Sequence, residues 1–469
     1  MHTLDRLSGS IVDEIVQSWI AWSLIIAYII LAVASPATEN LNLWMGGLAI
    51  VAILLGMNGL ARTELWLTSR GPAWFRKHPV ARVLHHIHNE GELAGIAIAG
   101  IVLLAQLHRG VHVHFALTEA FTLLGIMSAA NLSVRQMMPI MSLVERFTGT
   151  WGAIVVGSFL SSLTGEPAAA VFLSEYFKHR TAPQDKERVA TALGATIGSG
   201  GGLLPFSAPP ILIIWAILRS TFGWGLGDLL VLVGVGCLLH VTLVAWKLRP
   251  RIQPSNASSH RLTLKDTWPL LVLAVTVGLN VSYDTHHWTL LTWGWDAAIG
   301  IAALIAALQN PRIVESEGHE QQGRGRHWQP LTLGVLLMGL EIVGTEAEPL
   351  LHALAGLIPE NAPILLVALM LWYATAFTSH FADNALASRV FITVAASLTA
   401  VLGHGDLLAL SVVLGALFGG FLLIPANLPN FAIAAEFGIS SGGWARTAWR
   451  WYWSGIGHIV WITCFLFLG

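Results

Sequence analysis

Charged residues are scarce in this chain. Of its 469 residues only 11% are Asp, Glu, Lys or Arg, whereas a soluble domain carries about 25%. So few charges cannot cover a water-soluble protein of this size, and the apolar residues make up 55%. The shortage excludes a soluble enzyme and a disordered chain, and it predicts a protein whose main solvent is lipid.

Cysteine and an excess of one charge sign are also lacking. Cys237 and Cys464 stand alone in apolar runs, so they give neither a disulfide framework nor a metal-ligand spacing. The net charge of −2 favours no nucleic-acid partner. Residues 1–17 lack the basic start and cleavage site of a signal peptide, so we expect the first apolar run to remain as a membrane span.

Apolar runs long enough to cross a bilayer, about 20 residues each, recur along the chain. The regular runs lie at 18–35, 43–61, 91–107, 113–131, 228–247, 267–284, 290–308, 328–345 and 450–468. Interrupted runs lie at 150–178, 187–222, 362–400 and 407–436. Residues 311–327 are polar and glycine-rich, as expected of a solvent loop.

The positions of the basic residues select one topology. If 150–178 and 362–400 are re-entrant hairpins and the N-terminus is cytoplasmic, every Lys and Arg except Arg109, Arg219 and Arg389 faces the cytoplasm. If 150–178 crosses as one span, the basic cluster at 178–188 moves outside. We therefore predict an all-α, multi-pass protein of a bacterial inner membrane, with about 11 transmembrane helices plus two re-entrant hairpins.

The interrupted runs form two copies of one pattern. Residues 194–209 and 415–429 each hold a small-residue helix followed by a PxxxP break, 220 residues apart (425 − 205). Upstream of each break an acid marks a hairpin tip, Glu166 and then Asp383. In the topology above the two hairpins enter from opposite sides. Inverted repeats with paired broken helices are the sequence signature of a secondary transporter whose site lies at the midplane.

This pattern divides the chain into four parts. We expect an extra N-terminal helix at 1–42, a first inverted repeat at 43–248, a cytoplasmic linker at 249–266 and a second repeat at 267–469. The first repeat contains the hairpin 150–178 and the broken helix 187–222, and the second contains the hairpin 362–400 and the broken helix 407–436.

The two tip acids are the main candidates for binding an ion and a proton. A carboxylate at bilayer depth is costly and is a functional hypothesis by default; the alternative is that each acid lies in water at a hairpin mouth. Proline interrupts the helical hydrogen bonds and frees carbonyls that suit a hard cation such as Na⁺. The expected ion- and proton-binding residues are Glu166, Asp383, Asn384, Ser162, Thr164, Asn427, Ser379 and Ser207, and the helix-break residues are Pro205, Pro209, Pro425, Pro429 and Asn430.

Other polar residues within apolar runs leave alternatives open. Arg389 is either the counter-charge of Asp383 or an outward-pointing side chain, and Glu341 is either a proton relay or a structural carboxylate. Glu119 and Asp296 are weaker candidates, since they lie near span ends or among polar neighbours. His85, His86 and His88 read as an interfacial cytoplasmic segment or, less favoured, as a metal site, and the sequence leaves open whether they sense pH.

An enzymatic alternative rests on residues 225–228, which read GLGD and match the GxGD pattern of intramembrane aspartyl proteases. The second aspartate of that chemistry would have to be Asp284, which follows rather than precedes the motif. Asp228 also reads as a helix N-cap. We therefore expect no enzyme activity and no cofactor, only transported Na⁺ and H⁺.

The order of hairpin, broken helix and inverted second copy resembles the ion transporter superfamily, which includes NhaD- and NhaB-type Na⁺/H⁺ antiporters, ArsB-type arsenite pumps and divalent-anion/Na⁺ symporters. Residues 425–430 (PANLPN) look like its proline-rich break, 381–384 (FADN) like the acidic tip of its antiporter branch, and 161–167 (SSLTGEP) like the first-half tip of that branch. The resemblance implies that Asp383 and Asn384 bind a cation.

This sequence departs from the superfamily in two places. Residues 205–210 (PFSAPP) lack the asparagine of the second break, and neither tip has the Ser-Asn-Thr triplet of the carboxylate-transporting branch. We expect a Na⁺(Li⁺)/H⁺ antiporter; an arsenite or dicarboxylate transporter of the same superfamily is the alternative. The resemblance further implies a transport domain that moves against a scaffold, frequently in a homodimer. The expected partners are membrane lipid and a small inorganic ion.

Overall fold

A computed structural model describes residues 117–253, 267–286, 289–309, 350–381 and 384–468. These residues are almost entirely helical, and no strand is found among them; Thr181 and Ile252 form an isolated bridge. The expectation of an all-helical fold is confirmed for this part of the chain. The N-terminal spans, the linker 254–266, Glu341, Asp383 and the histidines at 85–88 lie outside the described residues.

The chain divides into two compact units, residues 1–120 with 301–353, and residues 121–300 with 354–469. The second unit holds nearly all of the described residues, and both candidate breaks lie in it. Within the described residues two helices, Leu226–Arg251 and Asn384–Leu402, are long and apolar enough to cross a membrane.

A helical hairpin turns at Gly165. Helix α6 (Leu117–Thr164), which bends at Gly149, leads into this turn, and α7 (Glu166–Lys178) leads out of it. Gly165 has a φ of 78°, a conformation that glycine adopts at little cost. The two arms lie side by side, because a Cβ on Gly157 would stand 2.5 Å from Leu173. The chain therefore folds back at Gly165.

Salt bridges and hydrogen bonds close the open end of this hairpin. Glu145 of α6 accepts hydrogen bonds from Arg180, from the Tyr176 hydroxyl at 2.6 Å and from the Thr150 hydroxyl at 2.8 Å. The Arg180 guanidinium also stacks over the Tyr176 ring. These contacts fix the base of the hairpin on the side away from Glu166.

The next helix of the first half is interrupted. After the turn η1 (Pro183–Asp185), α8 (Lys186–Gly200) ends in a glycine run and continues as the short turn η2 (Gly201–Leu203). An irregular segment follows, and then the helices α9 (Pro209–Leu212) and α10 (Trp215–Phe222). Pro209 opens α9 at a position where its missing N–H costs nothing.

The second half repeats this order. Helices α17 (Ile364–Phe381) and α18 (Asn384–Leu402) pack against each other and against α19 (Gly405–Gly419). After α19 come the turn η7 (Ile424–Ala426) and α20 (Leu428–Phe437). Helices α7, α8 and α9 start at residues 166, 186 and 209, and α18, α19 and α20 start at 384, 405 and 428, so each start recurs 218 or 219 residues later (384 − 166, 405 − 186, 428 − 209).

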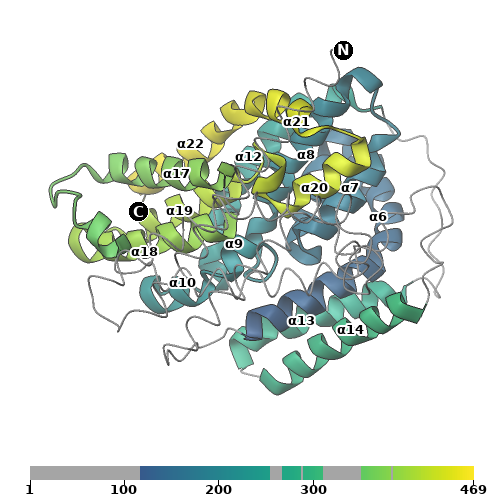
Figure 1. The fold of residues 1–469 in the computed structure, drawn as a ribbon, viewed down its shortest axis with the longest axis horizontal. Helices are drawn as coiled ribbons and strands as arrows, with labels where there is room; N and C mark the ends of the chain where they lie inside the picture. Colours follow the sequence, from purple (N-terminus) through teal and green to yellow (C-terminus); the bar gives the residue numbers. More distant parts are fainter. Residues whose placement is uncertain (1–116, 254–266, 287–288, 310–349, 382–383, 469) are drawn as a thin grey trace, which may run out of the picture. The chain divides into compact units, whose positions relative to one another are not determined.

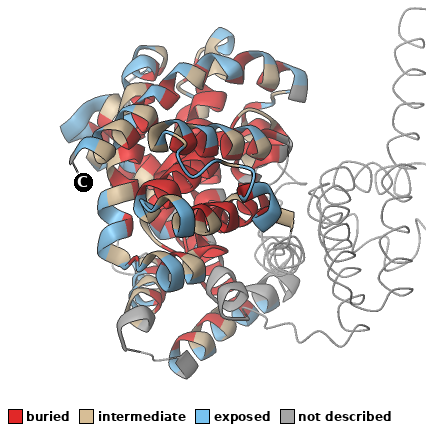
Figure 2. Ribbon diagram, turned by 90° about the vertical axis from the view of Figure 1, so that its left-hand side faces the viewer, coloured by how far each residue is buried: buried red, intermediate tan, exposed pale blue. Residues whose placement is uncertain are grey.

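The packing between the two halves is reciprocal. Helix α7 packs on α20, and α18 packs on α9, so the return arm of each hairpin contacts the helix that follows the other half's break (Figure 1). Lys178 at the end of α7 pairs with Glu436 of α20 at 2.7 Å. Helices α8 and α19 are buried along most of their length. Figure 2 shows the buried residues gathered in the interior of the described helices.

The remaining helices complete the described part of the chain. They are α11 (Leu226–Asp228), the π-helical turn η3 (Leu229–Val233), α12 (Gly234–Leu248), η4 (Arg249–Arg251), α13 (Trp268–His286), α14 (Thr289–Gln309), α21 (Ser441–Ala448), η8 (Trp449–Gly455) and α22 (Ile456–Leu468).

The position of Asp228 corrects one detail of the sequence analysis. The N-cap of α11 is Gly225, and Asp228 is the third helical residue, whose carboxylate accepts a hydrogen bond from Gly225 N at 2.7 Å. This capping contact, made at an exposed site, gives Asp228 a structural role.

Candidate functional site

A cluster of buried polar side chains forms where interrupted helices end. Glu166 is the first residue of α7 and is fully buried. Its backbone N–H donates to the Ser207 carbonyl at 3.4 Å, which ties the hairpin tip to the first break. The backbone of Gly201 lies against the carboxylate, since a Cβ on this glycine would lie 2.6 Å from Glu166 Oε1. Glycine is therefore required at 201 for the carboxylate to occupy this position.

Asn427 joins the second break to the first hairpin tip. It lies between η7 and α20, and its Nδ2 donates a hydrogen bond of 3.2 Å to Glu166 Oε2. The two residues are 261 positions apart in sequence. Both are buried, so the bond is shielded from water and joins the two halves at their interrupted helices.

Asn384 lies beside Asn427. It is the first residue of α18, and a Cβ on Gly420 would lie 3.2 Å from the Nδ2 atoms of both Asn384 and Asn427. Asn384 is only 1% exposed, and neither its amide oxygen nor its nitrogen has a hydrogen-bond partner among the described residues. A buried amide without partners costs about 1–3 kcal/mol. Its oxygen is thus a candidate ligand for an ion.

The predicted hydroxyl ligands have separate roles. Ser162 Oγ donates to the Gly200 carbonyl at 2.8 Å and accepts from Leu203 N at 3.0 Å, so it holds the end of α8. Ser207 Oγ donates to the Gly201 and Leu204 carbonyls within the same break. The Thr164 hydroxyl donates to Leu160 O on its own helix at 3.0 Å. The structure therefore places all three near Glu166 but occupies their protons with backbone carbonyls.

Ser379 lies at the other tip. A Cβ on Gly419 would lie 2.6 Å from Ser379 Cβ, and within the described part of the chain the buried Ser379 hydroxyl has no hydrogen-bond partner. The nearby His380 ring nitrogen Nδ1 lies 2.5 Å from the Gly419 carbonyl. Ser379 and Asn384 are thus two buried polar side chains flanking the residues 382–383, which the structure does not describe.

Asn430 satisfies the carbonyls that the second break frees. Its Nδ2 donates to Gly420 O at 2.6 Å and to Leu423 O at 2.8 Å. The first break has no asparagine, and there the Ser207 hydroxyl binds the equivalent carbonyls.

The break prolines have distinct places: Pro205 lies in the irregular segment, Pro209 opens α9, Pro425 lies in η7 and Pro429 in the first turn of α20.

The remaining candidate charges lie elsewhere or are only partly described. Arg389 is buried within α18 and donates from Nη1 to the Thr393 hydroxyl at 2.9 Å. Asp383 and Glu341, its suggested counter-charge and the suggested relay, are not among the described residues. Asp296, a weak candidate from sequence, is fully buried, and both of its carboxylate oxygens accept from Asn280 Nδ2 at 3.1 and 3.2 Å.

The helix ends set the electrostatics of the cluster. Helices α8 and α19 end at Gly200 and Gly419, so their partly negative carbonyl ends face the cluster. The positive N-terminus of α7 is occupied by the carboxylate of Glu166 from the same chain. A buried carboxylate, amide oxygens and carbonyl helix ends together form a set of oxygen atoms that suits a hard cation.

The partners of two glycine runs could not be identified from the sequence. Gly201 lies against the Glu166 carboxylate, and Gly420 lies against the amides of Asn384 and Asn427. The glycine runs lie at matching places in the two halves, and this match was the sequence signal that pointed to them.

Comparison with models of known protein families and with curated proteins finds no match to this chain, so its function is inferred from the residues themselves.

Proposed function

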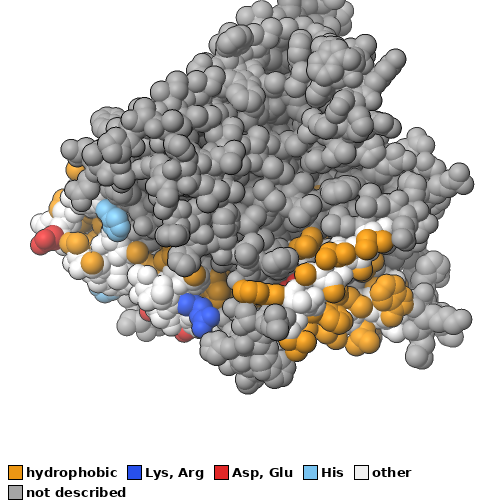
Figure 3. All heavy atoms as spheres, turned by 60° about the horizontal axis from the view of Figure 1, so that its bottom comes forward, with side chains coloured by type: hydrophobic (Ala, Val, Ile, Leu, Met, Phe, Trp, Pro, Cys, Tyr) orange, Lys and Arg blue, Asp and Glu red, His pale blue; other side chains and the backbone are white. Residues whose placement is uncertain are grey.

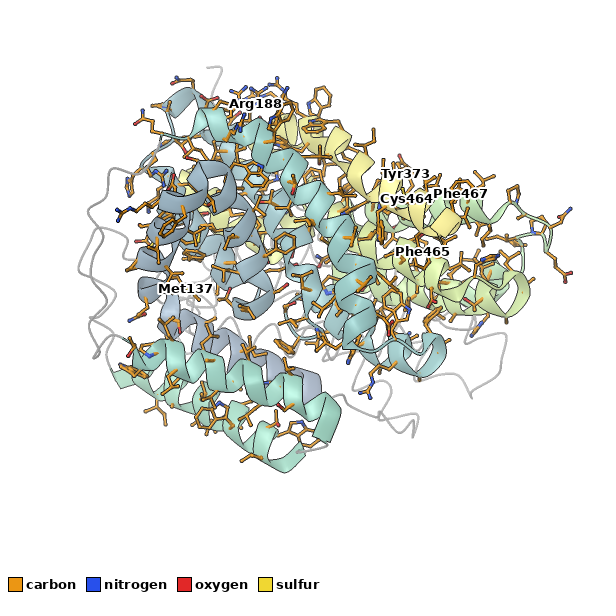
Figure 4. All side chains as sticks on the ribbon, turned by 180° about the vertical axis from the view of Figure 1, so that it is seen from behind. Met137, Arg188, Tyr373, Cys464, Phe465 and Phe467 are labelled. Carbon is orange, nitrogen blue, oxygen red and sulfur yellow. The ribbon has the colours of Figure 1, made fainter. Side chains whose placement is uncertain are left out.

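We propose that this chain is a membrane-embedded secondary transporter that exchanges Na⁺ or Li⁺ for H⁺ at the cluster around Glu166. The exposed apolar surface supports a lipid environment. Trp268 and Leu271 of α13 and Leu291 of α14 are each more than half exposed, and Figure 3 shows apolar side chains gathered on the face where these helices lie. Phe467 is 78% exposed, and Figure 4 shows it at the edge of the ribbon with Tyr373.

The repeated helix order supports the transporter architecture. Equivalent helices start 218 or 219 residues apart (384 − 166, 405 − 186), and each half's return arm contacts the helix beyond the other half's break. In secondary transporters such interrupted helices meet near the bilayer midplane, and their ends bind the substrate and the coupling ion. In the proposed topology, α7 and α18 are the return arms of two hairpins that enter the membrane from opposite sides.

The charge of the cluster favours a cation over an anion. An anion site needs helix N-termini or positive side chains that are not already neutralised. Here the N-terminus of α7 is occupied by Glu166, and in the sequence an aspartate, Asp383, directly precedes α18. The hydrogen bond between Asn427 and Glu166 is the observation that carries the proposal, because it joins a buried acid of one half to an amide of the other.

The proposed mechanism is competition for one carboxylate. When Glu166 carries a proton, its neutral carboxyl accepts the Asn427 hydrogen bond and has no charge to attract Na⁺. When the proton leaves, the carboxylate and the amide oxygens of Asn384 and Asn427 bind the cation. Because the carboxyl cannot hold both together, loading one ion releases the other. Asp383 would serve the same role from the second tip.

Proteoliposomes with an internal pH dye test this proposal. The wild-type protein is expected to move protons when Na⁺ or Li⁺ is added, and not when K⁺ or succinate is added. Glu166→Gln and Asp383→Asn should each abolish Na⁺-dependent proton movement. The matched control is Glu175→Gln, which removes an exposed carboxylate from the same helix α7 and should exchange at the wild-type rate.

Two outcomes would reject the proposal. Normal exchange by both Glu166→Gln and Asp383→Asn would make the acids structural. Uptake of succinate or arsenite without Na⁺/H⁺ exchange would instead identify the chain as an anion transporter.

A further inference from the structure

Three arginines from separate segments come together at one end of the described helices. Arg188 lies in the first turn of α8, Arg251 ends η4, and Arg450 is the second residue of η8. The positive charges of Arg251 and Arg450 both act on Arg188. The turn η8 packs against α8 and α12, and Trp451 Nε1 donates to the Thr191 hydroxyl at 3.0 Å, one turn from Arg188. Residues far apart in sequence thus build one positively charged cluster, the arginine site.

The nearby carboxylates leave the arginine site positively charged. Asp185 accepts a hydrogen bond from Arg251 Nη1 at 2.5 Å. Within the described part of the chain no carboxylate forms an ion pair with Arg188 or Arg450. The Nε atom of Arg251 is buried, and it has no acceptor among the described residues. Like charges held close together repel each other, so an anion bound between the arginines would stabilise the site.

The arginine site belongs to the side that the basic residues assign to the cytoplasm. All three arginines are among those expected to face the cytoplasm. Contacts join the segments that carry them: Gln253 N donates to the Arg180 carbonyl at 3.0 Å, and Arg446 pairs with Glu187 at 3.1 Å. The loop between α7 and α8, the turn η4 and the segment around η8 therefore lie together, as they must if all three are on one side of a membrane.

Exposed tryptophans accompany the arginines. Trp449 directly precedes Arg450 and is 60% exposed, and Trp453 of the same turn η8 is 41% exposed. Trp246, near the end of α12 and shortly before η4, is 56% exposed. Figure 4 shows Arg188 at the rim of the ribbon, among side chains that end in nitrogen. Tryptophan is enriched where a membrane protein meets the lipid headgroups, so the arginine site is placed at headgroup level.

We propose that the arginine site binds the phosphate of an anionic phospholipid headgroup in the cytoplasmic leaflet. Guanidinium groups donate paired hydrogen bonds to phosphate oxygens, and basic pockets between transmembrane helices on the cytoplasmic side suit such headgroups. Helix α8 runs from Arg188 to the glycine run beside Glu166, so a bound headgroup holds the start of this helix against η4 and η8. The inference rests on the membrane embedding in the proposed function and does not depend on which ion is carried.

Native mass spectrometry of the full chain in detergent tests the site, with phosphatidylglycerol as the anionic probe and phosphatidylcholine as the neutral one. The wild type should retain phosphatidylglycerol and release phosphatidylcholine. Arg188→Gln and Arg450→Gln should each weaken phosphatidylglycerol binding by about tenfold, as expected for the loss of a hydrogen bond to a charged group. The matched control is Arg146→Gln, which removes an exposed positive charge from α6, outside the site, and should bind phosphatidylglycerol as the wild type does.

Thermal unfolding in detergent gives a second measurement, because a ligand that binds the folded state raises its unfolding temperature. Phosphatidylglycerol should raise the midpoint of the wild type and of Arg146→Gln, and it should not raise that of Arg450→Gln. Arg450 is exposed, so this variant provides the test if Arg188→Gln does not fold.

Three results would overturn the inference. They are unchanged phosphatidylglycerol binding in Arg188→Gln and Arg450→Gln, equal weakening in Arg146→Gln, and displacement of the lipid by inorganic phosphate at constant ionic strength, which would identify a site for a soluble anion. Both measurements record binding without transport. Loss of lipid binding with intact Na⁺/H⁺ exchange in proteoliposomes therefore overturns this inference alone, and the absence of exchange with intact lipid binding overturns the proposed function alone.

Discussion

Adding one methyl group beneath Glu166 should weaken cation binding without unfolding the protein. In Gly201→Ala the new Cβ would lie 2.6 Å from Glu166 Oε1 and 2.7 Å from its Cγ, closer than side-chain atoms approach in proteins. The carboxylate must therefore move by several tenths of an ångström, and the 3.2 Å hydrogen bond from Asn427 lengthens or breaks. A hydrogen bond to a charged group contributes about 1.5–3 kcal/mol, and 1.4 kcal/mol corresponds to about tenfold in affinity.

The assay is the Na⁺ concentration that gives half-maximal exchange in proteoliposomes. We expect it to rise about 10- to 100-fold in Gly201→Ala, while thermal unfolding in detergent remains cooperative. Gly227→Ala is the matched control, because a Cβ at that exposed position meets no atom within 4 Å. An unchanged Na⁺ requirement in Gly201→Ala would refute the position assigned to the Glu166 carboxylate in the site.

Two further predictions concern stability. Asn430→Leu leaves the Gly420 and Leu423 carbonyls without their buried donor. It should lower the free energy of unfolding by about 1–3 kcal/mol for each carbonyl, measured by thermal or denaturant unfolding; an unchanged midpoint would contradict this. For Glu145, burial opposes ionisation, but hydrogen bonds from Arg180, Tyr176 and Thr150 outweigh it and hold its pKa below the ordinary 4.5. A lowered pKa in the folded state stabilises the fold above pH 4.5 and is lost as the pH falls below it. Glu145→Gln should therefore be less stable than the wild type at pH 7, and the difference should shrink in acid; a difference independent of pH would argue against an ionised Glu145.

The interruptions of the helices could be predicted from sequence because their causes are local. Proline lacks an N–H and fixes φ, so Pro209 and Pro429 open new helices wherever the chain places them. Gly165 provides the positive φ at the first turn. The repeat of these signals in the second half needed only a comparison of the sequence with itself.

The contacts within the cluster could not be predicted in this way. The hydrogen bond between Asn427 and Glu166 joins residues 261 positions apart and depends on how α7 packs against α20. The direction of a hydroxyl depends on its rotamer, and the Thr164 and Ser207 protons point to backbone carbonyls. Asp228 is the third residue of its helix rather than the N-cap, a difference of three positions that composition does not reveal.

The buried His240 shows a second limit. His240 lies in an ordinary apolar helix, α12, and its hydroxyl partners come from α8 and η8, which are 41 and 214 residues away. A histidine in an apolar run is more often a satisfied core residue than a functional one.

The central claim is that the buried Glu166 carboxyl releases a proton when a cation binds. The most direct measurement is the proton release, in lightly buffered detergent solution, when Na⁺ is added to the purified protein between pH 5 and pH 9. The account predicts a saturable release in the wild type, a smaller one in Glu166→Gln, and none in the double variant that also carries Asp383→Asn. Na⁺ binding without any proton release at these pH values would contradict it.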